Sequence, residues 1–196
     1  MQNQQIVIAA DWSHALRNVT AGLGGEITPK EVVDLREQLT SLVWAEGCPR
    51  AESFFAGSDT PRYRRQLIAS AADGSYTMLL IAWPPGYVTP LHDHAELWGI
   101  ELVLDGTLEV EEFFSDGDPA QPTLQRHRSL LLGSGDAAVF IDPAYVHRCR
   151  NLSAQQPALS LHVYGGQLDD YRSFVEAGND LYRISQQRAL LDAVSI

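Results

Sequence analysis

The chain has 196 residues, of which 45% are hydrophobic, and a formal net charge of −11. This length suits one domain with a substantial core, and the composition is that of an ordinary globular protein. The negative charge disfavours nucleic acid and anionic membrane surfaces, so we expect neither as a partner.

The N-terminus and the cysteines predict where the protein works. The first ten residues lack a basic region and carry too short an apolar run for a signal peptide. No stretch approaches the roughly 20 apolar residues of a membrane span. Two cysteines, Cys48 and Cys149, are too few for a disulfide framework. We therefore expect a cytoplasmic, reducing location.

The first sixty or so residues predict helices. Ser13–Val19 suits a short helix. A second helix begins with Thr28 at the N-cap, Pro29 at the first helical position and Glu31 completing a capping box. Apolar residues at helical spacing continue it to about Ala45. An amphipathic stripe of this kind predicts a helix that packs on the outside of the structure that follows.

From Tyr76 onward the pattern changes to short strands. Tyr76–Trp83 is almost wholly apolar, as expected for a strand covered on both faces. Asp105-Gly106 is a two-residue hairpin signal between two strand-like runs, the second of which alternates apolar residues with glutamate. Asp116–Pro119 is a predicted loop. Further strands are expected at 126–132, 137–141, 147–152 and 158–164.

These elements favour a mainly β protein, built as an antiparallel barrel or sandwich with helices outside. We expect one domain over residues 1–196. Residues 1–60 would form a helical N-terminal part, residues 61–166 the barrel and residues 167–196 a C-terminal tail. The tail from Asp169 to Leu191 suits mixed loop and helix that closes one end.

Three histidines form a candidate metal site. His92 and His94 are two residues apart on an extended segment, so they share a face while Asp93 points away. Their Cα atoms would be about 7 Å apart at roughly 3.3 Å per residue, and both rings could reach one metal ion. A His-x-His pair alone is commonly two solvated side chains. His147, at the edge of a later strand, makes a metal site the better interpretation, although three histidines suit zinc as well as iron.

The spacing around these histidines resembles a known pattern. Gly86-x5-His92-x-His94, Gly106 and His147-x3-Asn151 look like the paired motifs of the cupin family, a jelly-roll-like antiparallel β-barrel. Gly99 holds the place of the glutamate that commonly completes that metal site. A cupin with three histidines and no carboxylate is similar to the thiol dioxygenases of the cysteine dioxygenase family.

Two further segments strengthen the resemblance. Ser160-x-His162-x-Tyr164 resembles the Ser-His-Tyr triad of that family, and Tyr63-x-Arg65 resembles its substrate-binding segment. The resemblance covers about Tyr63 to Tyr164. It implies a single cupin domain and an enzyme that uses molecular oxygen and a small thiol.

The resemblance also implies roles for these residues. His92, His94 and His147 would hold Fe(II). In the triad, Ser160 and His162 would orient the Tyr164 hydroxyl toward the bound oxygen, while Arg65, with Tyr63, would bind a substrate carboxylate. The expected reaction converts a small carboxylated thiol to its sulfinic acid. Neutral imidazoles leave the ion its full charge, and a thiol bound to such an ion loses its proton.

Several alternatives stay open. A Ser-His hydrolase is disfavoured because no Gly-x-Ser-x-Gly elbow is present. Arg65 has arginine neighbours at 62 and 64, and all three could simply be solvated. The arginine at position 65 resembles cysteine-using enzymes, whereas other segments resemble the 3-mercaptopropionate branch. In that branch a further arginine falls one residue from Arg172. The sequence leaves the thiol undecided.

Two rival functions remain. The chain could be another metal-dependent cupin enzyme, such as a carbon-oxidising dioxygenase or an isomerase. It could also be a non-catalytic cupin that binds a small ligand.

Overall fold

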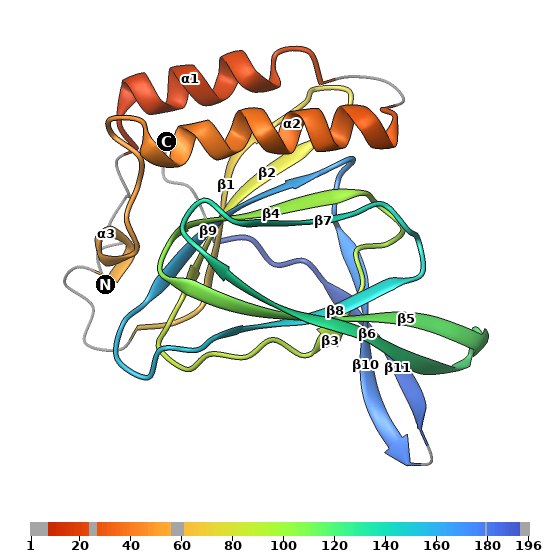
Figure 1. Ribbon diagram of the computed structural model, residues 1–196. Coiled ribbons are helices and arrows are strands. Elements are labelled where there is room, and N and C mark those ends of the chain that lie inside the picture. Colours follow the sequence, from red (N-terminus) through yellow and green to blue (C-terminus); the bar gives the residue numbers. More distant parts are fainter. Residues whose placement is uncertain (1–7, 24–26, 56–60, 179, 193–196) are drawn as a thin grey trace.

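A computed structural model describes residues 8–23, 27–55, 61–178 and 180–192. In these residues helices lie over one β-sheet, and a second set of strands faces the other side of that sheet (Figure 1). Residues 1–7, on which part of the leader-peptide expectation fell, lie outside the described residues.

The helices precede all the strands, as predicted. They are α1 (Ala10–Thr20), α2 (Pro29–Ser41), the 3-10 turn η1 (Leu42–Trp44) and α3 (Ala51–Phe55). The capping box at the start of α2 is confirmed: Glu31 N–H donates to the Thr28 hydroxyl, and Thr28 N–H donates to the Glu31 carboxylate at 2.8 Å. No described helix is long and apolar enough to cross a membrane.

One sheet has five antiparallel strands and carries the helices. Its order is β1 (Arg64–Ser70), β2 (Thr77–Trp83), β9 (Ala158–Tyr164), β4 (Gly99–Asp105) and β7 (Ala137–Phe140). Its outer face packs on α1 and α2, and its inner face forms a second core with the opposite strands. Every residue of β2 and β9 is buried, because both faces of these strands are covered. The predicted packing of the helix on the outside is confirmed.

The other strands pair in a closed order. They are β10 (Asp170–Gly178), β11 (Leu181–Arg188), β6 (Gln121–Gly133), β5 (Thr107–Asp118), β8 (Tyr145–Asn151) and β3 (Leu91–His92), with β3 pairing back to β10. All the pairings are antiparallel. The mainly β, cupin-type architecture expected from the sequence is therefore confirmed.

Two local predictions were wrong. Asp105-Gly106 does not close a hairpin: β4 pairs with β7 and β9, whereas β5 pairs with β6 and β8, so the turn carries the chain from one sheet to the other. Gly106 does have the expected positive φ, 87°. The loop predicted at Asp116–Pro119 is largely strand, because β5 runs to Asp118.

The tail was also predicted wrongly. The segment expected as mixed loop and helix contains the β10–β11 hairpin, which pairs with β3 and β6. Burial does not alternate strictly along these strands, since in β10 the two adjacent residues Ser173 and Phe174 are the buried ones, so the sequence carried no clear two-residue period there.

Candidate metal centre

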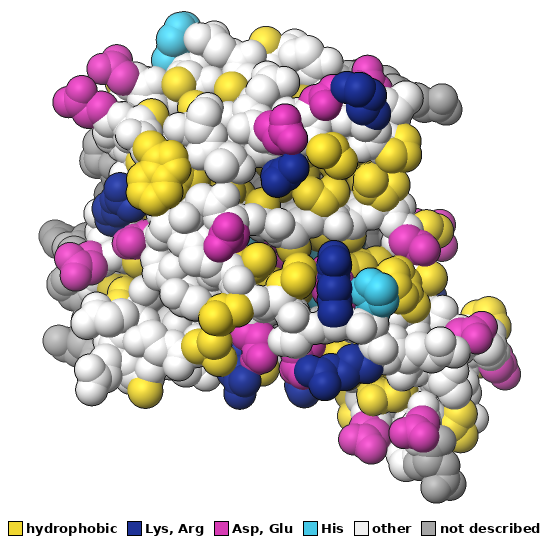
Figure 2. Space-filling view, in the orientation of Figure 1, with side chains coloured by type: hydrophobic (Ala, Val, Ile, Leu, Met, Phe, Trp, Pro, Cys, Tyr) yellow, Lys and Arg dark blue, Asp and Glu magenta, His cyan; other side chains and the backbone are white. Residues whose placement is uncertain are grey.

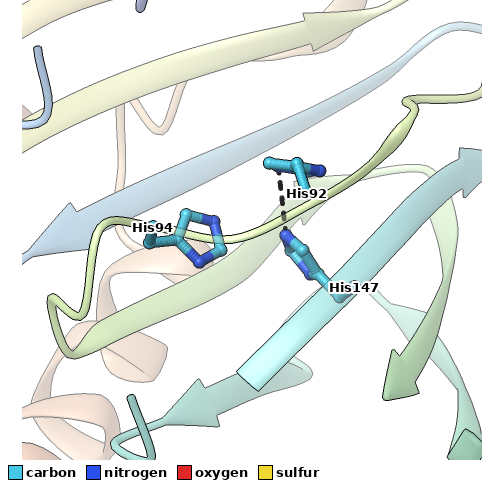
Figure 3. Close-up of side chains that lie close together, drawn as sticks. All are labelled: His92, His94 and His147. Atoms are coloured by element: carbon cyan, nitrogen blue, oxygen red, sulfur yellow. Dashed lines mark hydrogen bonds between the residues drawn. The ribbon is translucent and has the colours of Figure 1, made fainter. Parts of the chain in front are cut away.

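The three predicted metal ligands meet in one pocket. His92 on β3 and His147 on β8 are direct register partners, and their Nε2 atoms lie 3.3 Å apart. His94 follows two residues later, with its ring centroid 5.2 Å from that of His92 and 4.7 Å from that of His147. One ring nitrogen from each of the three lies within 4.8 Å of the others (Figure 3).

The hydrogen bonding of the three rings fits a metal ion. His92 Nδ1 lies 2.9 Å from the Pro90 carbonyl oxygen, so Nδ1 carries the hydrogen and Nε2 keeps a lone pair. Both ring nitrogens of His94 are buried, and neither has a hydrogen-bond partner among the residues that the structure describes. Leaving such a group unsatisfied costs about 1–3 kcal/mol, which coordination of one nitrogen would relieve. His147 likewise turns Nε2 toward His92.

An ion pair anchors the segment between the two histidines. Asp93, 1% exposed, points away from the cluster as predicted and accepts from the Arg172 side chain (Nε, 2.5 Å) and backbone N–H (2.8 Å). The side chain of Arg172 thus pairs with Asp93 and ties the His-Asp-His segment to β10. Directly after His94 the chain turns through two residues in the left-handed region, Ala95 (φ 51°) and Glu96 (φ 65°).

Gly99 is explained by packing. A side chain at this position would point into the inner core, where its Cβ would lie 2.1 Å from the ring of Phe140. That ring stacks on His94, with centroids 4.3 Å apart and planes 14° apart. Phe140 therefore occupies the space that a side chain at position 99 would need, and it holds the His94 ring in place.

The predicted Ser-His-Tyr triad forms one connected line on β9. Ser160 Oγ lies 2.8 Å from His162 Nε2, and His162 Nδ1 lies 3.0 Å from the Tyr164 hydroxyl. The line continues beyond the predicted residues, because Trp83 Nε1–H donates to Ser160 Oγ at 2.8 Å. Burial raises the pKa of Tyr164 well above the ordinary value, so its hydroxyl keeps its proton at neutral pH.

The structure separates the three neighbouring arginines. Arg62 is exposed and pairs with Asp192 at 2.8 Å, and Arg64 donates to the Phe54 carbonyl at 3.1 Å. The side chain of Arg65 lines the pocket of the histidines, over the ring of Tyr171. The Arg65 backbone N–H donates to Asp192 at 2.9 Å, but among the described residues its guanidinium has no carboxylate partner, unlike that of Arg62.

Tyr63 lines the same pocket. Its ring stacks on Tyr87, with centroids 4.5 Å apart, and burial raises the pKa of its hydroxyl. The structure thus brings all eight predicted site residues to one pocket or to its wall. They are His92, His94, His147, Ser160, His162, Tyr164, Arg65 and Tyr63.

Sequence reasoning missed one charged group in this pocket. Glu101 on β4 is 4% exposed, and its carboxylate lies 3.4 Å from His147 Nδ1 and 3.3 Å from His162 Nδ1. A buried carboxylate therefore lies beside the predicted three-histidine ligand set, and the sequence analysis did not identify it. The signal was available, because Glu101 is two residues from Gly99 and shares its strand face.

The ionisation of this pocket follows from burial. Burial lowers the pKa of His147 well below its ordinary value, so this ring is neutral at neutral pH. Burial alone would raise the pKa of Glu101, but His147 and His162 beside it lower that pKa to about 2. A charged pair between a His147 imidazolium and the Glu101 carboxylate would contradict the lowered pKa of His147. Glu101 therefore lies beside a neutral His147 ring, close enough for the Nδ1–H group of that ring to donate to its carboxylate.

Together the fold and the site define a cupin-type barrel protein with a three-histidine cluster able to hold a metal ion. More specifically, the chain belongs to the cysteine dioxygenase type I family, whose model matches residues 23–177. Membership in this family makes it an oxidoreductase of the thiol dioxygenase class.

Individual relatives share a minority of their residues with this chain. Cysteine dioxygenase type 1 of Homo sapiens is 26% identical over 77% of this chain and 72% of its own length. The enzyme of Bos taurus is 27% identical over 84% of this chain and 78% of its own. Among solved structures, TT1209 from Thermus thermophilus is similar over 57% of this chain and 90% of its own, with 22% identity and a TM-score of 0.43.

Proposed function

We propose that the protein is a non-haem iron(II) thiol dioxygenase that oxidises a small carboxylated thiol, such as cysteine or 3-mercaptopropionate, to the sulfinic acid. The observation that carries this proposal is the shared pocket. It is lined by three converging histidines, by an arginine whose guanidinium has no carboxylate partner in the described part of the chain, and by the His162 and Tyr164 side chains of the Ser-His-Tyr line. We further propose a single domain over residues 1–196 and a cytoplasmic location.

His92, His94 and His147 are the proposed metal ligands. Iron(II) bound by them would supply an electrophilic centre for a thiolate and for molecular oxygen. Three neutral imidazoles leave the ion its full positive charge, which favours the thiolate over the thiol. The proximity of the three nitrogens supports this assignment, as does the lack of a hydrogen-bond partner for His94 within the described ranges.

Arg65 is the proposed carboxylate-binding residue. A guanidinium can donate two parallel hydrogen bonds to a carboxylate, and this guanidinium has no such partner among the described residues. Tyr63 would bound the same end of the pocket beside it. This arrangement accounts for a substrate with a carboxylate at one end and a thiol at the other.

Tyr164 is the proposed proton donor near the reacting sulfur and oxygen. Trp83 can only donate, so Ser160 accepts from it, and we propose that the Ser160 hydroxyl donates in turn to His162 Nε2. His162 then carries its hydrogen on Nδ1 and donates toward the Tyr164 oxygen. The tyrosine hydrogen is left free to point into the pocket.

Oxygen consumption by the iron-loaded protein tests this function. The substrates to compare are L-cysteine, 3-mercaptopropionate, mercaptosuccinate, homocysteine and cysteamine, with the product identified as sulfinate by mass spectrometry. We expect turnover of at least one carboxylated thiol and poor use of cysteamine, which lacks the carboxylate. Equal use of cysteamine would remove the role of Arg65. No oxygen uptake with any thiol would favour a ligand-binding cupin or a different substrate class.

A further inference from the structure

Glu101 makes the same kind of contact with two histidines that have different proposed duties. Its Oε2 lies 3.4 Å from Nδ1 of His147, a proposed metal ligand. Its Oε1 lies 3.3 Å from Nδ1 of His162, the middle of the Ser-His-Tyr line. The opposite ring nitrogens face elsewhere: His147 Nε2 meets His92, and His162 Nε2 meets Ser160.

The surroundings of Glu101 give its carboxylate few other donors. In the described part of the chain its ion-pair contacts are all to histidines, and the remaining close group is Cys149 Sγ, 3.6 Å from Oε2. A buried carboxylate without arginine or lysine must be satisfied by hydrogen bonds. Besides the weakly donating Cys149 thiol, the Nδ1–H groups of the two rings are the donors within reach.

A second line of contacts predicts the same tautomer for His162. Trp83 takes up one lone pair of the Ser160 oxygen, which leaves the serine hydrogen free to donate to His162 Nε2; in that arrangement the ring hydrogen lies on Nδ1. That hydrogen faces both the Tyr164 oxygen, 3.0 Å away, and Glu101. The indole at one end and the carboxylate at the other therefore favour one arrangement of hydrogens along the line.

We propose that Glu101 is a positioning residue that sets the tautomers of both His147 and His162. By accepting from Nδ1–H of His147 it leaves the Nε2 lone pair of that ring to the metal. By accepting from Nδ1–H of His162 it keeps the Tyr164 hydrogen directed into the pocket. One carboxylate thus links a metal ligand to the proton-donating line. This inference rests on the proposed three-histidine metal centre, although its tests do not require thiol oxidation.

Geometry favours this role over direct ligation. Oε2 faces Nδ1 of His147, whereas the nitrogen of that ring turned toward the other proposed ligands is Nε2. Oε1 is 3.8 Å from His94 Nε2, farther than it is from His162 Nδ1. Direct ligation by Glu101 is nevertheless a distinct outcome, and the experiment below separates it.

Metal binding gives the first test. Co²⁺ and Zn²⁺ are titrated into metal-free, full-length protein carrying Glu101→Gln or Glu101→Leu. The control is Glu111→Gln, because Glu111 lies on the outer face of β5 and pairs with Arg126 and Arg148. Loss of a carboxylate behind a metal-bound histidine weakens metal binding by about 10–100-fold, and we expect this for both Glu101 variants and not for the control. Affinities equal to those of the control would overturn the proposal.

Histidine NMR gives the second test. It measures which ring nitrogen carries the hydrogen, and a merely structural role of Glu101 would leave that unchanged. In ¹⁵N-labelled, Zn²⁺-loaded wild type we expect the ring hydrogens of His147 and His162 on Nδ1. In Glu101→Gln these Nδ1–H signals should shift and exchange faster with water. Wild-type rings protonated on Nε2 would contradict the proposal. So would a changed Co²⁺ absorption spectrum with unaltered Nδ1–H signals, because that pair of results identifies Glu101 as a metal ligand.

If the wild type binds metal and shows these tautomers but oxidises no thiol, the proposed function fails and the role of Glu101 stands. If the wild type oxidises thiols and the Glu101 variants bind metal like the control, the proposed function stands and the role of Glu101 fails. A folded variant is checked by its circular dichroism and its thermal transition, and Glu101→Gln is the isosteric choice should Glu101→Leu misfold.

Discussion

Strand β8 shows two electrostatic environments on its two faces. His147 and Cys149 face inward and are 0% and 1% exposed, whereas Arg148 and Arg150 alternate with them and face outward. Outside, Arg148 pairs with Glu111, and Arg150 pairs with Glu109 at 2.5 Å. Figure 2 shows basic and acidic side chains next to one another over the lower half of the molecule, where these strands lie.

The two faces use glutamate differently. Glu111, with 16% of its side chain exposed, pairs with Arg126 and Arg148, whose side chains are about half exposed to solvent. Glu101, with 5% exposed, lies among imidazoles and a thiol. Water screens the outer pairs, whereas an unmatched polar atom inside pays its full desolvation cost. Substitutions on the inner face should therefore change chemistry, and those on the outer face should change little.

The largest effect is expected for His92→Ala. Removal of one of three ligands should weaken Co²⁺ binding by more than the ~100-fold that loss of a supporting partner costs. Titration followed by visible absorption measures this. The control is His127→Ala, since His127 is an exposed histidine on β6 outside the cluster. Equal affinities in the two variants would remove His92 from the ligand set.

Tyr164→Phe should lower turnover strongly while sparing the metal. A positioned proton donor contributes about 10²–10⁴-fold, so we expect kcat for the best thiol to fall by that order with unchanged metal content. Oxygen uptake and metal analysis on the same sample give both values. Tyr76→Phe, which removes a hydroxyl outside the metal pocket, is the control. Loss of metal in Tyr164→Phe would instead assign that residue a structural role.

Arg65→Ala should chiefly affect carboxylated thiols. A hydrogen-bonded charge pair contributes about 1.5–3 kcal/mol, which corresponds to roughly 10–100-fold in kcat/KM. Use of cysteamine should hardly change. Arg62→Ala removes the exposed neighbour that pairs with Asp192 and should leave every substrate unaffected. A uniform loss across all thiols would argue that Arg65 stabilises the pocket rather than the substrate.

Arg172→Met tests the anchor of the histidine segment. It leaves Asp93 buried with its backbone donors but without the guanidinium. We expect a loss of about 1–3 kcal/mol in the free energy of unfolding, measured with urea. Arg183→Met changes an exposed arginine on β11 and should be close to neutral. Matching stabilities would show that the backbone contacts to Asp93 suffice.

Glu111→Gln should have the smallest effect. The Arg148 hydrogen bond lowers the pKa of Glu111, so its folded form is charged more readily than its unfolded form. The resulting stabilisation is present above the ordinary glutamate pKa and is lost as pH falls through the lowered folded-state value. We expect a difference of at most ~1 kcal/mol near pH 7 that declines in acid and in salt. A larger, salt-insensitive effect would contradict the contrast between the faces.

How much of this follows from sequence can be judged from particular elements. The capping box at Thr28 and the buried strand β2 were predictable, because both depend on local patterns of residue type. The convergence of His92, His94 and His147 was predicted from motif spacing together with family resemblance. The hairpin at Asp105-Gly106 was not predictable, because a turn signal specifies the bend and leaves the partner of each strand undetermined. The prediction for the tail failed for a related reason. Its residues form strands because they pair with β3 and β6, and that pairing cannot be read from the tail's own sequence.

By itself, then, the sequence determined the elements whose causes are local, the strand face that His92 and His94 share, and the residue types available for a metal. Tertiary structure alone decided why position 99 has no side chain and that Glu101 lies against His147 and His162. Those facts depend on register between strands distant in the chain. Register is fixed by packing of both sheet faces, which no local pattern encodes.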